Sequence, residues 1–261
     1  MRFHVPKPLH GWREFVGQVG IIVLGVLIAL GAEQALETVH DRHQQHERLE
    51  RLFEEARSNV TQLRDERDST RAMTQRESAF ATALSTGSCP PEDQWQAVST
   101  VTMYPAITPN TSVYDEVVGA GGLASIDSIR ARKTVANFHS TLVWVQSQTE
   151  FFRSHSSLPI AIDDPRVTVS FDPKADEPEL MTFNRPQLCN DRAFRNRIAD
   201  HVRDHVTIYT YRDGLTESAI QMCASLGYLI GRTCVPTDRH PLVGSDLKVA
   251  EEAVNRARKE G

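Results

Sequence analysis

The clearest feature of the hydropathy pattern is one uninterrupted apolar segment near the N-terminus. Residues 15–32 contain no charged side chain, and Gln18 is their only strongly polar residue. Eighteen helical residues rise about 27 Å at roughly 1.5 Å each, which approaches the ~30 Å hydrocarbon core of a bilayer. Because such a helix is apolar on every face, it belongs in a protein core or in lipid. We therefore predict one transmembrane helix over residues 14–35. Its apolar character is set by Phe15, Ile21, Leu24, Leu30 and Ala32.

After this segment the pattern changes to that of an amphipathic helix. A first set of positions has the 4, 3, 4, 3 spacing of a heptad seam: Ala32, Leu36, Val39, His43 and His46. A second set repeats this spacing after an extra step of three residues: Leu49, Phe53, Ala56, Val60 and Leu63. We predict a long membrane-proximal helix over residues 36–86, ended by Gly87 and two prolines. Its apolar stripe either joins two copies of the chain or packs on the chain's own helices.

The remaining pattern predicts a mainly α-helical domain over residues 87–233. A short helix is expected first, over residues 91–104. Ser112 and Asp115 have the spacing of a capping box for a second helix. A third helix is predicted over residues 127–153, with its first residue, an aspartate, as the N-cap.

The last third of the chain contains one irregular region and two further helices. Residues 158–188 are rich in proline, and we expect one short strand there at 166–171. The longest remaining helix is predicted over residues 190–232. A charged and only partly ordered helix is predicted over residues 245–260, within a C-terminal tail of residues 234–261.

Two glycine motifs are interpreted as structural. The cluster at residues 119–122 follows a helix and lacks a downstream Lys-Ser/Thr pair, so it indicates a helix stop and not a phosphate-binding loop. Gly227 and Gly231 form a GxxxG, but the apolar block around them is far shorter than a bilayer span. We interpret this motif as a place where helices pack closely.

The charge pattern bears on partners and on orientation. The chain has 261 residues, 40% apolar and 24% charged, and its net charge of −5 gives no nucleic-acid footprint. Arg2, Lys7 and Arg13 precede the apolar segment, whereas Arg42 is the only basic residue among the fifteen that follow it. This asymmetry favours a cytoplasmic location for residues 1–13.

Four cysteines permit two disulfides if the domain lies outside the cytoplasm. Cys223 and Cys234 flank a predicted helix end and turn. Cys89 and Cys189 both lie in loops beside predicted helix ends. We favour the pairs 89–189 and 223–234, whereas four free thiols would indicate a cytoplasmic domain.

Two groups of histidines are candidate metal ligands. His43 and His46 lie on the heptad seam, where a homodimer would bring four imidazoles together. His201 and His205 have the i, i+4 spacing of two ligands on one helix face, but the glutamate of H-E-x-x-H is missing. The alternatives are a solvated polar stretch for the first group and core histidines for the second. The sequence contains no nucleophile elbow, Walker loop or dinucleotide fingerprint, so we predict no cofactor and no catalytic residue.

The apolar segment also resembles a known family. Residues 17–30 read G-Q-V-G-I-I-V-L-G-V-L-I-A-L, which is similar to the G-E-I-x-L-V-V-I-G-I-L-I-A-L opening of a family of uncharacterised bacterial single-span membrane proteins. A second similar patch comprises residues 113–117, 121–123, Ile126 and 129–130. The resemblance implies a retained anchor and a mostly helical outer domain, and it implies no activity.

Together these patterns predict a single-pass protein of the bacterial inner membrane with a helical periplasmic domain for protein interaction or envelope sensing. The expected partners are the lipid bilayer and either a second copy of the chain or another envelope protein. Two alternatives stay open. One is a metal-dependent periplasmic enzyme that uses His201 and His205. The other is a soluble secreted domain, released by signal-peptide cleavage near residues 29–31.

Overall fold

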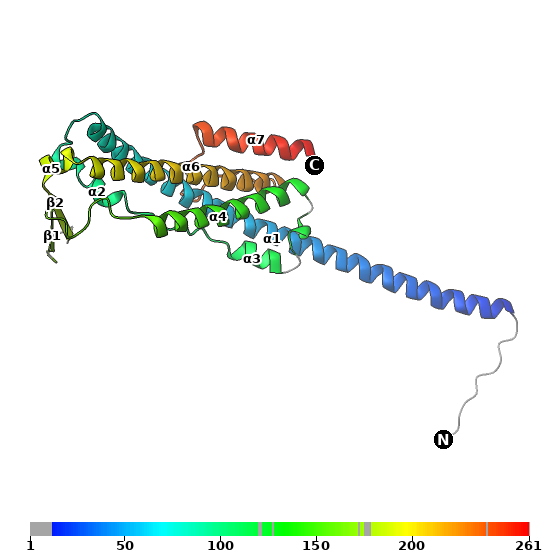
Figure 1. The fold of residues 1–261 in the computed structure, drawn as a ribbon. Coiled ribbons are helices and arrows are strands. Elements are labelled where there is room, and N and C mark those ends of the chain that lie inside the picture. The colour runs from blue at the N-terminus through cyan, green and yellow to red at the C-terminus, as the bar shows by residue number, and fades with distance from the viewer. Residues whose placement is uncertain are drawn as a thin grey trace, which may run out of the picture. The chain divides into compact units, whose positions relative to one another are not determined.

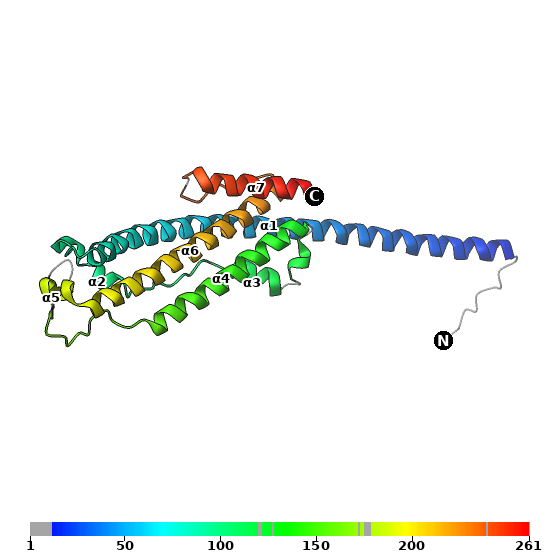
Figure 2. The same ribbon diagram turned by 45° about the horizontal axis from the view of Figure 1, so that its top comes forward.

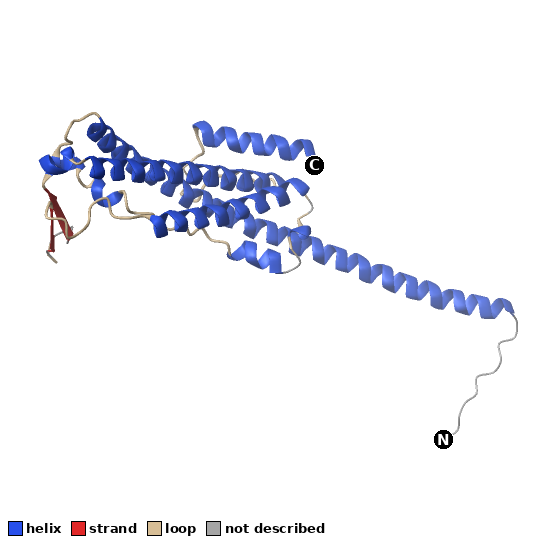
Figure 3. Cartoon of the chain, in the orientation of Figure 1, coloured by secondary structure: helices blue, strands red, loops and turns tan. Residues whose placement is uncertain are grey.

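The computed structural model is mainly helical, which confirms the predicted fold class (Figure 3). The structure describes residues 12–119, 122–126, 128–171, 173–174, 179–238 and 240–260. The chain divides into two units, Met1–Glu50 and Arg51–Gly261, and helix α1 (Trp12–Ser85) contributes residues to both.

In the first unit, α1 contains the apolar segment. Among the described residues, one helical stretch is long and apolar enough to cross a bilayer, Phe15–Gln34. None of it is buried inside the structure, so it is not a core helix of this chain. Leu36 and Val39, beyond this stretch, are also 72% and 66% exposed. A helix with these properties serves either as a membrane span or as a signal sequence.

Long helices pack side by side in the second unit (Figures 1 and 2). They are the Arg51–Ser85 part of α1, α4 (Ile129–His155), α6 (Arg192–Leu229) and α7 (Gly244–Glu260). α6 lies against α4 and α7. It also runs antiparallel to α1, as three contacts show: Phe53 beside Gly227, Leu63 with Thr216, and Glu77 with His205.

The burial of α1 side chains shows what covers the second half of the predicted apolar stripe. Phe53, Ala56, Val60 and Leu63 are at most 3% exposed. The second half of the stripe therefore packs on the chain's own helices. The first half belongs to the other unit, and its five side chains are all exposed: Ala32, Leu36, Val39, His43 and His46.

Shorter elements connect the long helices. They are η1 (Glu92–Gln94), α2 (Ala97–Thr100), α3 (Ser112–Gly119), η2 (Leu123–Ser125), β1 (Val167–Phe171), β2 (Glu179–Phe183) and α5 (Arg185–Asn190). The strand predicted at 166–171 is confirmed as β1, and it pairs antiparallel with β2, which the sequence analysis missed. The single helix predicted over 91–104 is wrong: η1 and α2 replace it, because Trp95 between them turns into the core.

Helix α3 is capped from another part of the chain. The Glu55 carboxylate of α1 accepts hydrogen bonds from the backbone N–H groups of Val113 (2.7 Å) and Tyr114 (3.2 Å). These are orphan donors of the first helical turn, and a carboxylate suits the positive end of the helix dipole. Burial raises the pKa of Glu55, although these hydrogen bonds oppose the rise. The predicted capping box is therefore wrong, because Ser112 Oγ itself donates to Glu55.

Helices α4 and α6 begin at ordinary N-caps. Ser128 Oγ accepts from the N–H of Ala131 at the start of α4, and Asp191 accepts from the first turn of α6. The predicted cap at position 127 lies outside the described residues, as do residues 120 and 121 of the glycine cluster.

The GxxxG motif has two separate structural roles. Gly227 is buried at the end of α6, and a Cβ there would meet the Arg232 carbonyl oxygen at 2.5 Å and the Phe53 ring at 2.9 Å. It is therefore a site of close packing, as predicted. Gly231 lies beyond α6 with φ +70°, the left-handed conformation in which glycine ends a helix.

The helix predicted over residues 245–260 is confirmed as α7, which packs as part of the bundle. It packs on α6 through Ala250, Ala253 and Ala257, which are at most 8% exposed. At its first turn, Asp246 forms a bidentate ion pair with Arg67 of α1, at 2.8 and 3.0 Å. The packing of α7 on the bundle was not predictable from local patterns, because this partner is 179 residues away in the sequence.

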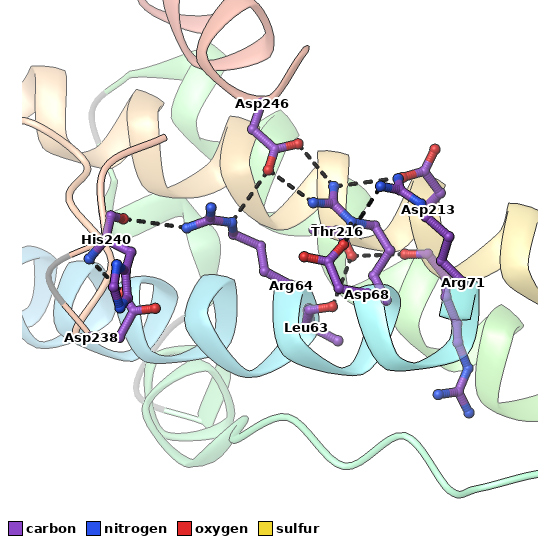
Figure 4. Close-up of polar contacts among 11 residues, drawn as sticks. Leu63, Arg64, Asp68, Arg71, Asp213, Thr216, Asp238, His240 and Asp246 are labelled. Carbon is purple, nitrogen blue, oxygen red and sulfur yellow. Dashed lines mark hydrogen bonds and ion pairs between the residues drawn. The ribbon is translucent and has the colours of Figure 1, made fainter. Parts of the chain in front are cut away.

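Polar side chains of α1 also hold the segment that joins α6 to α7. The Arg57 guanidinium donates to the Val235 carbonyl (2.6 Å), and the N–H of Thr237 donates to Thr61 Oγ (2.9 Å). Arg64 donates to the His240 carbonyl, as Figure 4 shows. Successive positions on one face of α1 thus guide this segment toward the start of α7.

Candidate functional site

A groove of about 920 Å³ opens between the β-hairpin and the segment over residues 92–103. Its walls come from η1 and α2, from the loop over residues 158–162, and from β1 and β2. We call it the hairpin groove. Its apolar lining includes Trp95, Met103, Leu158, Ile162, Met181 and Phe183.

The floor of the hairpin groove is a rigid aromatic cluster. The Trp95 ring lies 5.4 Å from Phe80 in an edge-to-face arrangement and 6.0 Å from Phe194 in a stacked one. Its indole N–H donates to the Pro90 carbonyl at 3.1 Å, so the one polar atom of this buried side chain is satisfied. The floor is therefore held in place by both packing and hydrogen bonding.

A disulfide fixes one wall of the groove. Cys89, just before η1, is bonded to Cys189 of α5, with the two Cα atoms 5.5 Å apart. Cys223 is bonded to Cys234 at the far end of α6, with a Cα separation of 5.6 Å. Both favoured pairs are thus confirmed, and the described chain contains no free cysteine.

Arginines fix the other wall. Arg166 forms ion pairs with Asp164 at 2.6 Å and with Asp191 at 2.7 Å, which ties the start of the hairpin to the start of α6. The Arg166 hydrogen bonds lower the pKa of Asp164 to about 2 and also lower the pKa of Asp191. Arg197 of α6 donates to the Pro159 carbonyl at 2.6 Å and so positions the loop over residues 158–162.

The hairpin itself has one apolar face. Because side chains alternate along a strand, Val167 and Val169 share a face with their register partners Phe183 and Met181. Phe171, whose register partner is Glu179, lies on the same face of β1. Val167 and Phe183 pack on the hydrophobic core, whereas Phe171 is 72% exposed. The apolar face therefore extends beyond the part that the bundle covers.

The lining of the groove is mainly apolar and includes a few charged residues. The charged residues of its lining are Glu92, Asp93 and Arg185, and Arg185 pairs with Glu92 at 3.3 Å. The described lining includes no histidine, cysteine or lysine. An apolar cleft with a few polar groups at its rim suits the capture of an apolar ligand.

The predicted pair His201 and His205 lies in the core and not in the groove. His205 Nδ1 is 2.6 Å from a carboxylate oxygen of Glu77, and both side chains are at most 2% exposed. His201 Nδ1 instead faces the Tyr104 hydroxyl at 3.5 Å. The two imidazoles therefore have different partners, and both fit the interpretation as core histidines. Burial also raises the pKa of Tyr104 to about 12.

The predicted pair His43 and His46 lies in the first unit. Each imidazole pairs with a glutamate four residues later on α1: His43 with Glu47 at 3.2 Å, and His46 with Glu50 at 3.5 Å. All four side chains are mainly exposed. Within the described residues, no group of three or more His, Cys, Asp or Glu side chains is arranged to hold a metal ion.

The groove was not predicted from the sequence, because its walls come from four separate segments. The alternating pattern V-T-V-S-F did predict β1. Its partner E-L-M-T-F was assigned to an irregular region because prolines surround it. The apolar residues Met181 and Phe183, two positions apart in that region, were the available signal for a second strand.

No protein-family model, curated protein or solved structure matches this chain. The class of protein therefore follows from the architecture alone. It combines an N-terminal helix long enough to span a membrane with a disulfide-bonded helical bundle that contains an apolar groove.

Proposed function

We propose that the chain is a single-pass protein of the bacterial inner membrane whose periplasmic bundle binds another envelope protein in the hairpin groove. The observation that carries the proposal is the exposure of apolar side chains around a fixed aromatic floor. Met103, Leu158 and Ile162 are 53%, 56% and 62% exposed at the groove. Exposed apolar clusters in soluble domains commonly mark interaction sites.

The edges of the hairpin indicate what kind of partner fits. Among the described residues the sheet contains β1 and β2 alone, so each strand has one edge that is not covered by another strand. An extended peptide can pair with such an edge while its alternate side chains enter an adjacent groove. We therefore propose an extended, apolar peptide segment as the ligand.

Three observations support the membrane location. The apolar helix over Phe15–Gln34 is unburied, and basic residues concentrate before it. Two disulfides fit an oxidising compartment such as the periplasm. The rival is cleavage of the same helix as a signal peptide, which would leave a secreted bundle with the same groove.

Intact mass under non-reducing conditions tests the location. Protein from the membrane fraction should have the full-length mass less four hydrogens, and it should resist thiol alkylation. A chain that begins near residue 32 would overturn the anchor in favour of secretion. A full-length chain with four alkylatable thiols would overturn the periplasmic location.

Peptide selection tests the groove. A random peptide library is selected on the full-length protein in nanodiscs, and the selected peptides are titrated against variants. Met103→Asp and Ile162→Asp should each weaken binding at least about tenfold, the loss expected when a contact worth about 1.4 kcal/mol is removed. Val243→Asp is the matched control, because Val243 is equally exposed but lies outside the groove lining. Failure to select peptides, or equal loss in all three variants, would contradict the proposal.

A further inference from the structure

The heptad seam of the first unit extends backward into the apolar segment. Counting from Ala32 in alternating steps of three and four residues gives Ala29, Gly25, Ile22 and Gln18. One unbroken pattern therefore runs from the membrane segment into the exposed helix that follows it. We propose that this seam, Gln18–His46, is the interface with a second, parallel copy of the chain.

No part of the chain that the structure describes covers this seam. The Phe15–Gln34 stretch is entirely unburied, and Leu36 and Val39, which follow it on the same helix, are 72% and 66% exposed. A Cβ added at Gly25 would meet nothing within 4 Å. Leu36 and Val39 lie outside the predicted span, so lipid does not cover them either. Their exposure requires a protein partner for the apolar surface to leave water.

The composition of the seam within the span fits contact between two helices in lipid. Gly25, Ala29 and Ala32 are small, and small residues let two backbones approach closely in a membrane. Gln18, the only strongly polar side chain of the segment, lies on this same face. An amide in hydrocarbon is costly without a hydrogen-bond partner, and the symmetric contact supplies the second copy's amide as that partner.

Topology selects a second copy in a parallel arrangement. Two copies of this chain insert with the same orientation, so identical seam positions meet at the same depth in the bilayer. Heptad packing then continues from the span through Leu36 and Val39 without a change of face. This step rests on the proposed function, because it requires that the apolar segment is retained as an anchor.

The end of the seam coincides with the start of the bundle. The heptad position after His46 is Glu50, a charged residue. The extra step of three residues instead leads from His46 to Leu49, and the apolar stripe continues from there to Phe53, which is buried within the second unit. The helix thus changes partner, from a second copy before Glu50 to its own bundle after it.

Cysteine crosslinking in isolated membranes tests the seam. The four native cysteines are all in disulfides, so a single introduced cysteine is the reporter. Mild oxidation should convert the Leu36→Cys variant to a full-length covalent dimer. Glu37→Cys is the matched control, because Glu37 is the exposed neighbour that faces away from the seam.

A glycine pair tests the contact inside the membrane. Gly25→Leu, added to the Leu36→Cys variant, should reduce the dimer at least about fivefold, which corresponds to about 1 kcal/mol. Gly20→Leu is its control, since Gly20 lies on the opposite face and also has open space around it. Equal crosslinking at positions 36 and 37, or equal effects of the two leucines, overturns the seam while the anchor stands. Loss of the full-length chain from the membrane fraction overturns both.

Discussion

Replacing Asp246 by asparagine is expected to loosen α7 from the bundle. The Asp246 carboxylate and the Arg67 guanidinium are joined by two hydrogen bonds of 2.8 and 3.0 Å, and their side chains are only 7% and 8% exposed. Arg64 lies 3.3 Å from the same carboxylate (Figure 4). The rest of the buried face of α7 is mostly alanine, which buries little apolar surface. The ion pair is therefore a large part of what holds α7.

The expected cost follows from the charge that is left behind. Removing one partner of a buried ion pair typically costs about 3–5 kcal/mol, because the other charge stays buried without compensation. Here Arg67 keeps Asp213 at 3.5 Å and Asp68 at 3.3 Å, and both carboxylates are more exposed. We therefore expect the lower end, about 3 kcal/mol.

Hydrogen exchange of the α7 amides measures this cost directly, in the full-length protein in detergent. A loss of about 3 kcal/mol corresponds to exchange that is roughly 150-fold faster, if α7 opens locally. Glu252→Gln is the control, because its pair with Arg256 on the same helix is exposed. The double variant Arg67→Met, Asp246→Leu should recover much of the protection, because it buries no unpaired charge at these two positions. Exchange in Asp246→Asn within threefold of wild type would refute this reasoning.

Three further changes have defined outcomes. Gly227→Ala should lower the free energy of unfolding by about 1–3 kcal/mol, because its Cβ would overlap the Arg232 carbonyl. Gly214→Ala has open space around its Cβ and should raise the free energy of unfolding by about 0.5–1 kcal/mol. Urea unfolding of both variants measures the two changes, and equal effects would contradict this expectation. Replacing Cys89 and Cys189 together by alanine should lower the free energy of unfolding by about 4–5 kcal/mol in the same assay, because the disulfide spans 100 residues. An unchanged urea midpoint would show that this disulfide does not constrain the unfolded chain. One of the five tyrosines should ionise near pH 12 in an ultraviolet titration, and Tyr104→Phe should abolish that late step. The folded state raises the pKa of Tyr104 above the ordinary value of about 10. The stability that this group contributes is therefore complete below pH 10 and is lost as the pH rises toward 12. Ionisation of all five tyrosines near pH 10 would exclude a raised pKa for Tyr104.

Local patterns in the sequence were sufficient for most of the helical architecture. The apolar run, the caps and the stop at Gly87 predicted α1, α4 and α6 to within a few residues, because each signal lies within a turn or two of the element that it defines. The disulfide pairs were also predictable, since each cysteine lies beside a helix end. The residues of the candidate metal sites were correctly placed on helices, but the sequence did not reveal that Glu77 and Tyr104 are the partners of His205 and His201.

Tertiary structure decided the features that join distant segments. Glu55 caps a helix 58 residues away, Arg67 pairs with a carboxylate 179 residues away, and four separate segments line the hairpin groove. The stripe on α1 shows the division most clearly. Periodicity alone identified both of its halves as apolar faces. Only the packed structure showed that Phe53–Leu63 is covered by the chain's own helices, whereas Leu36 and Val39 remain exposed. The physical reason is that periodicity specifies which face of a helix must leave water, but not which surface covers it.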